Sequence, residues 1–99
     1  MMARRARHDG SGIAELSALV NLGPVSAGWL VAAGIHSREQ LERLGAVRAF
    51  HRVLIHRGGI GVSRNLLYAL DGALRGVRWD HLPPQVREEL RRAADAPSD

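Results

Sequence analysis

Apolar residues recur every three or four positions along most of the chain, which is the spacing of an amphipathic helix. The first such stretch runs from Ile13 to Val20 and predicts a short helix. The run Asn21-Leu22-Gly23-Pro24 then breaks the periodicity, as a tight connection does. A second helix is predicted from Val25 to about Ala33, because the ring of Pro24 fixes a φ angle suited to a first helical turn and Gly34 is a natural C-terminal cap.

A third and a fourth helix are predicted between residues 37 and 57. Ser37-Arg38-Glu39-Gln40 has the form of a capping box, so a short helix begins there and runs to Leu44. A longer helix, from Ala46 to about Ile55, carries an apolar stripe along one side and ends at Arg57. The stripe consists of Val47, Phe50, Val53 and Leu54, and the residues that lie elsewhere around the helix are Arg48, His51, Arg52 and Ile55.

The second half of the chain predicts a glycine-rich turn and two more helices. Gly58-Gly59-Ile60-Gly61 is too glycine-rich for the interior of a helix or a strand, so it predicts a turn or a mobile loop. Ser63 starts the most apolar helix, which continues to about Leu74 and which we expect at the centre of the core. Pro83-Pro84 precedes a last amphipathic segment from Gln85 to about Ala93, with a thin apolar face.

These elements predict a single all-α domain. No segment alternates apolar and polar residues as a half-buried strand does, so we expect a compact bundle of five or six short helices. A chain of 99 residues, 45% of them hydrophobic, has room for one core. We place the domain at residues 13–94, between a disordered basic tail at 1–12 and a disordered tail at 95–99.

Composition limits the compartment and the partners. There is no cysteine, so the core alone must stabilise the fold. No signal peptide and no apolar span are found, so we expect a cytoplasmic protein that does not enter a membrane. The net charge of +4 favours an anionic partner, although every basic residue is arginine, which codon bias in a genome rich in G and C would also produce. The distribution is more specific than the total, because residues 43–70 contain five arginines and no acidic residue.

Two blocks of sequence resemble the C-terminal domain of the TfoX/Sxy family. The first runs from Asn21 to Leu30 and continues through Gly34-Ile35 and Leu41. The second runs from Asn65 to Gly76, with Trp79 and Leu82-Pro83 after it. Two separated blocks in the right order are far more specific than one.

The resemblance implies a compact helical domain from a family of bacterial competence regulators, which are linked to DNA uptake and to transcription with the cAMP receptor protein. Those regulators usually carry another domain in front, so this chain is expected to be a stand-alone version. On this basis we expect a non-catalytic regulatory or adaptor domain that docks on a protein of the transcription or DNA-uptake machinery.

The first block also resembles a helix-hairpin-helix, which suggests a second, nucleic-acid-binding hypothesis. Gly23 and Ser26 lie where backbone N–H groups of a helix N-terminus would meet a phosphate, since a small residue permits close approach. Pro24 removes one donor, and Val25 replaces a glycine that is common in such hairpins. The alternative is that Asn21, Gly23 and Ser26 only shape and cap a buried turn.

A basic helix face is the second candidate for binding phosphates. Arg48 and Arg52 are four residues apart and so project on one side, with His51 beside them and Arg57 near the helix end. Such a face is often only solvated, and no aromatic residue is interleaved there to stack on bases. A third hypothesis is a homodimer that buries Trp79 and the thin face formed by Val86 and Leu90.

The sequence gives no support for catalysis, a metal or a cofactor. The five histidines are scattered, and no pair has a carboxylate at a spacing typical of metal sites. The glycine run 58–61 lacks the lysine of a phosphate-binding loop, and no serine lies in a nucleophile-elbow pattern. We expect no enzymatic activity and assign the few aromatic residues to the core.

Overall fold

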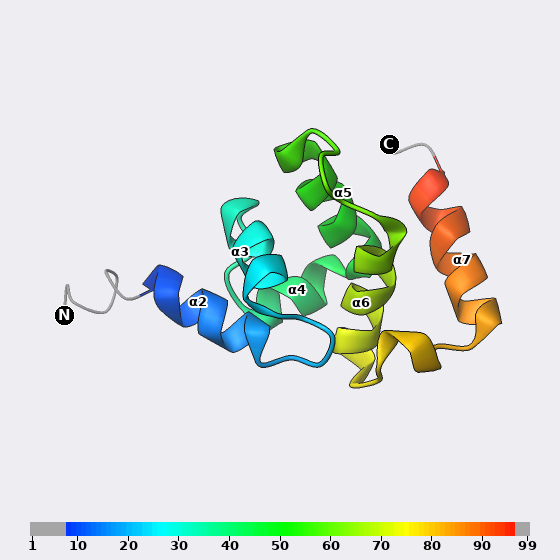
Figure 1. Cartoon of the computed structure of the whole chain (residues 1–99), viewed down its shortest axis with the longest axis horizontal. Coiled ribbons are helices and arrows are strands. Elements are labelled where there is room, and N and C mark those ends of the chain that lie inside the picture. Colours follow the sequence, from blue (N-terminus) through cyan, green and yellow to red (C-terminus); the bar gives the residue numbers. More distant parts are fainter. Residues whose placement is uncertain (1–7, 97–99) are drawn as a thin grey trace.

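The computed structural model describes residues 8–96, with side chains described from residue 12 onward. Within this range the chain forms six α-helices, one short 3₁₀-helix and no strand, which confirms the all-α prediction (Figure 1). The helices are α2 (His8–Ser17), α3 (Pro24–Ala32), α4 (Arg38–Leu44), α5 (Ala46–Arg57), α6 (Arg64–Arg75) and α7 (Pro84–Asp95), and the 3₁₀-helix is η1 (Trp79–His81).

The first and last described helices extend past the predicted domain bounds. Helix α2 begins at His8, before the domain boundary predicted at residue 13, so residues 8–12 are helical. Helix α7 continues to Asp95, which was predicted to start the C-terminal tail. The remaining tail residues, 1–7 and 97–99, lie outside the described part of the chain.

Local sequence signals set the helix ends. The Ser37 hydroxyl accepts a hydrogen bond from the N–H of Gln40 at 3.1 Å, and the Gln40 side chain accepts one from the N–H of His36 at 2.6 Å. This is the predicted capping box, except that the Gln40 side chain bonds to the N–H of His36 and not to that of Ser37. Gly58 ends α5 in the left-handed region at φ 62°, so the glycine-rich run forms a defined turn there.

The core is built around α5 and α6. Helix α6 supplies six buried residues, more than any other helix described, as its apolar sequence predicted. Helix α5 has the central position, because it packs against α3, α4, α6 and α7 (Figure 1). The largest fully buried side chains are Leu16, Leu30, Ile35, Leu41, Val53, Leu67 and Leu70.

Helix α7 lies along α5 and α6, at the opposite end of the molecule from α2 (Figure 1). Leu90 and Ala94 pack against the core. The carbonyl of Ala94 lies 2.8 Å from Nε2 of His51, and Asp95 forms an ion pair of 2.9 Å with Arg64. Leu90, which the homodimer hypothesis placed between two copies, is therefore used within the chain.

Asn21 connects the two sequence blocks. Its Nδ2 donates to the carbonyls of Ala69 (3.3 Å) and Val77 (2.8 Å), and its Oδ1 accepts from the N–H of Trp79 at 3.0 Å. Asn21 also has a left-handed backbone, with φ 74°, which asparagine adopts more readily than most residues. A single amide thus holds the α2–α3 turn against α6 and the start of η1.

Gly72 makes room for this contact. A Cβ at Gly72 would collide with the carbonyl oxygen of Val77 and with Nδ2 of Asn21. Gly28, on α3, is the opposite case, because a Cβ there would meet nothing within 4 Å. The packing therefore requires glycine at position 72 but not at position 28.

Gly72→Ala and Gly28→Ala are expected to change stability in opposite directions. Gly72→Ala should lower the free energy of unfolding by about 1–3 kcal/mol, because the methyl group overpacks the Asn21 contact. Gly28→Ala should raise it by about 0.5–1 kcal/mol, because alanine costs less conformational entropy in a helix. Urea denaturation followed by circular dichroism measures both, and a stabilising Gly72→Ala would contradict the packing described.

Asn21→Asp and Asn65→Asp introduce the same charge at two different positions. Asn21 forms three hydrogen bonds to the main chain, and Asn65 is exposed. The carboxylate introduced by Asn21→Asp would face two carbonyl oxygens, so we expect a loss of about 2–4 kcal/mol in the free energy of unfolding. Asn65 is exposed in the first turn of α6, where a negative charge interacts favourably with the helix dipole. Equal effects of the two variants in thermal denaturation would show that the Asn21 hydrogen bonds do not stabilise the fold.

Candidate functional site

Arg48 and Arg52 lie together on the exposed side of α5, as predicted. Neither forms an ion pair or a hydrogen bond with any of the described side chains or main-chain groups. Other arginines on this acid-free segment are engaged: Arg43 pairs with Glu39 on α4 at 3.5 Å, and Arg64 pairs with Asp95. Two adjacent cations on α5 are therefore left for solvent or for a partner.

Arg57 is not part of this free pair. Its guanidinium lies over the ring of Trp29, with Cζ 4.3 Å from the ring centroid. Its Nε donates to the carbonyl of Ile60 at 2.9 Å, which fastens the glycine-rich turn. A cation held by an aromatic ring and a main-chain oxygen contributes to folding, so the structure gives Arg57 a structural role.

His51 also departs from the predicted basic face. The ring is half-buried and bonds to the carbonyl of Ala94, on the side of α5 that faces α7. Arg48 and Arg52 remain as the basic pair of α5, without His51 beside them. The sequence pattern placed His51 off the apolar stripe correctly, but helical spacing alone did not show that α7 covers that side.

Gly23 and Ser26 occupy the N-terminal end of α3. Gly23 is the residue before the helix, with an extended backbone at φ −118°, and a Cβ there would meet nothing within 4 Å. The fold therefore has no steric need for glycine at this position. Ser26 is half-buried and lines a surface hollow of about 300 Å³ together with Trp29 and Trp79.

The predicted site residues do not form one surface. Gly23 precedes α3, whereas Arg52 lines a hollow with Ala33 at the other end of that helix. The rise of an α-helix puts these two ends about 15 Å apart. The Gly23 turn and the Arg48/Arg52 pair are thus separate candidate sites, with Arg57 bound to Trp29 between them.

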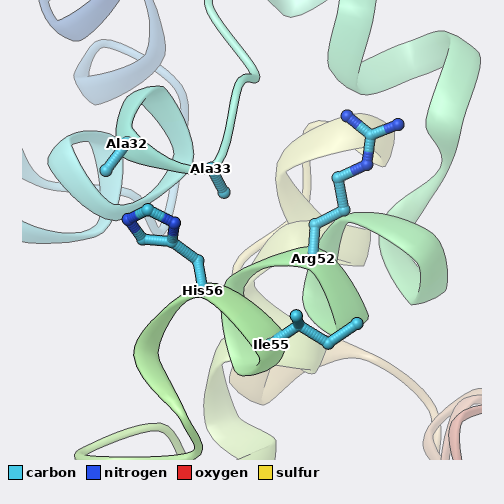
Figure 2. Close-up of a pocket in the computed structure, with 5 residues that line it drawn as sticks. All are labelled: Ala32, Ala33, Arg52, Ile55 and His56. Carbon is cyan, nitrogen blue, oxygen red and sulfur yellow. The ribbon is translucent and has the colours of Figure 1, made fainter.

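The hollow beside Arg52 adds residues that the sequence did not single out. It has a volume of about 380 Å³ and is lined by Ala32 and Ala33 at the end of α3 and by Arg52, Ile55 and His56 of α5 (Figure 2). Ile55 is 81% exposed, although it is a large apolar residue. We call this surface, with Arg48 included, the Arg52 face. Its signal in the sequence was the position of Ile55 off the apolar stripe.

Other kinds of site find little support in the described residues. No group of three or more metal-ligating side chains comes together in this part of the chain. None of its helices is both long enough and apolar enough to cross a membrane.

Comparison with known proteins identifies the family. Residues 13–94 match the sequence profile of the TfoX C-terminal domain. The chain belongs to this family. The two blocks that suggested the resemblance are those that Asn21 joins in the TfoX C-terminal domain fold.

A solved structure is similar over most of the chain. It is the crystal structure of an uncharacterized protein from Listeria monocytogenes, in a triclinic form. The two share 35% sequence identity with a TM-score of 0.72, over 80% of this chain and 88% of that one. No protein of curated function matches.

Arg57→Ala and Arg52→Ala are expected to separate the structural arginine from the free one. Arg57→Ala should lower the free energy of unfolding by about 1–2 kcal/mol, because it removes the contact with Trp29 and the bond to Ile60. Arg52→Ala should change it by less than about 0.5 kcal/mol. Urea denaturation compares them, and equal losses would contradict the roles assigned to these arginines.

Proposed function

We propose that this TfoX C-terminal domain is a non-catalytic regulatory or adaptor domain that works in the bacterial cytoplasm by binding another protein. The observation that carries the proposal is family membership over residues 13–94. The family's link to competence suggests a partner in transcription or DNA uptake, such as the cAMP receptor protein.

The surface of the domain supports protein binding. Large apolar side chains are exposed at Val25 (67%), Ile55 (81%) and Ile60 (71%), and Trp79 is partly exposed (37%). At Ile55 the exposure coincides with a hollow and an unpaired arginine. Apolar groups surrounded by polar ones are typical of protein interaction sites.

Nucleic-acid binding is the second candidate, favoured by the open space at Gly23. Since neither its φ angle nor its neighbours require glycine, close approach of a phosphate to the α3 N-terminus would explain the residue. Two features weigh against this candidate. Arg57 and His51 are held by other parts of the fold, and the free arginines lie at the far end of α3.

Co-purification followed by reconstitution tests the proposal. We expect the tagged chain, expressed in a bacterium that encodes it, to retain a transcription or DNA-uptake protein, and the two purified proteins to bind saturably in calorimetry. In parallel, fluorescence anisotropy measures binding of the chain to a labelled DNA duplex at low and at physiological salt.

The two functions give opposite results in this pair of measurements. A defined protein complex with no duplex binding at physiological salt supports the adaptor function. Duplex binding that survives physiological salt and is lost in the Arg48→Glu/Arg52→Glu variant, with no protein complex, would replace it with nucleic-acid binding. The single charge reversal Arg91→Glu, on α7, serves as the control.

A further inference from the structure

The Arg52 face combines an apolar hollow with unpaired positive charge. In Figure 2 the His56 ring points toward Ala32 and Ala33, while the Arg52 guanidinium and Ile55 extend away from that ring. The methyl groups of the two alanines and the Ile55 side chain give the hollow an apolar lining. Arg52 and His56 supply polar groups at its border.

A second, smaller hollow adjoins the first at Arg52. It has a volume of about 200 Å³ and is lined by Gly34, Gln40, Arg43, Leu44 and Arg52. Arg52 therefore stands between two depressions, one bounded by α3 and α5 and the other by α4 and α5. An elongated ligand lying across this face would meet the guanidinium near its middle.

The charges on this face are not neutralised within the described residues. Arg48 and Arg52 are about 6 Å apart along the axis of α5. Two carboxylates four residues apart on a partner helix would have the same spacing. Arg43, at the edge of the second hollow, shares its charge with Glu39. No carboxylate is found on α5 itself. Charge complementarity therefore calls for a ligand with acidic groups.

The exposed apolar groups decide between an acidic protein and a nucleic acid. A phosphate backbone would pair with Arg48 and Arg52 but would leave Ile55 in water. An amphipathic helix with carboxylates four residues apart and an apolar side chain beside them matches both parts of the surface. It would place the apolar side chain against Ile55 and the alanines while its carboxylates reach the two arginines.

We propose that the Arg52 face is the docking surface for an acidic, amphipathic helix of a protein partner. The proposal rests on the protein-binding function above and deepens it by naming the surface and the chemistry of the partner. Arg52 and Arg48 pair with carboxylates, and Ile55 with Ala32 and Ala33 receives one apolar side chain. The Gly23 turn takes no part.

The test is an NMR titration of the full-length ¹⁵N-labelled chain with two defined probes. One probe is an alanine-based helical peptide of about 16 residues, with two glutamates four apart and a leucine beside them. The other is a DNA duplex. We expect the peptide to shift the amide signals of Ala32, Ala33, Arg52 and Ile55, and the duplex to leave them unchanged.

Variants and a charge swap make the contacts specific. Arg48→Glu/Arg52→Glu and Ile55→Ser should each weaken peptide binding by about tenfold or more. A peptide with lysines in place of the glutamates should bind the double-glutamate variant better than the native chain. Arg91→Glu is the control and should bind the acidic peptide as the native chain does. Loss of binding in Arg91→Glu as well would overturn the assignment to this face.

The remaining outcomes distinguish failure of this docking surface from failure of the proposed adaptor function. Shifts of the Arg52 face with the duplex but not the peptide would overturn both the docking surface and the adaptor function. No shift on this face with either probe, up to about 1 mM, would overturn the docking surface alone and leave the co-purification result standing. Concentration-dependent shifts of the same amides without any probe would make a second copy the occupant and would also overturn it.

Discussion

The amide of Asn21 is the interaction on which the arrangement of this domain depends. It joins the turn between α2 and α3 to residues about fifty positions later in the chain. Its partners are the carbonyl of Ala69 within α6, the carbonyl of Val77 after α6 and the N–H of Trp79. Gly72 supplies the space that this amide needs. Among the described residues, no other hydrogen bond joins α2, α3 or the turn between them to α6 or η1.

The position of α3 then divides α5 into a bound part and a free part. Trp29 of α3 receives the Arg57 guanidinium, which in turn fastens the turn after α5. On another side of α5, His51 bonds to α7. What remains open is the side that carries Arg48, Arg52 and Ile55, next to the C-terminal end of α3. The Arg52 face is thus the side of α5 that α3 and α7 leave uncovered.

Local patterns predicted the helices well, because periodicity, serine caps and glycine ends act over a few residues. The roles of individual polar residues were less predictable, since they depend on contacts distant in sequence. In the sequence Asn21 is an ordinary turn residue, because its hydrogen-bond partners in α6 and near η1 are distant along the chain. Arg57 and His51 read as parts of one basic face, yet Trp29 and Ala94 determine where their side chains go. The family blocks nevertheless contained both ends of the Asn21 contact.

Within the described part of the chain, Arg48 and Arg52 have no ion-pair partner, whereas several other helical arginines do. Arg38, Arg75 and Arg91 each have a carboxylate three or four residues away on the same helix. Helix α5 holds no acidic residue that could pair with them. Arg48 and Arg52 repel each other because they are like charges four residues apart, which costs about 0.5 kcal/mol at most. This repulsion, like the exposure of Ile55, brings no stability to the isolated domain. Carboxylates of the proposed partner would offset the repulsion, and its apolar side chain would remove Ile55 from water.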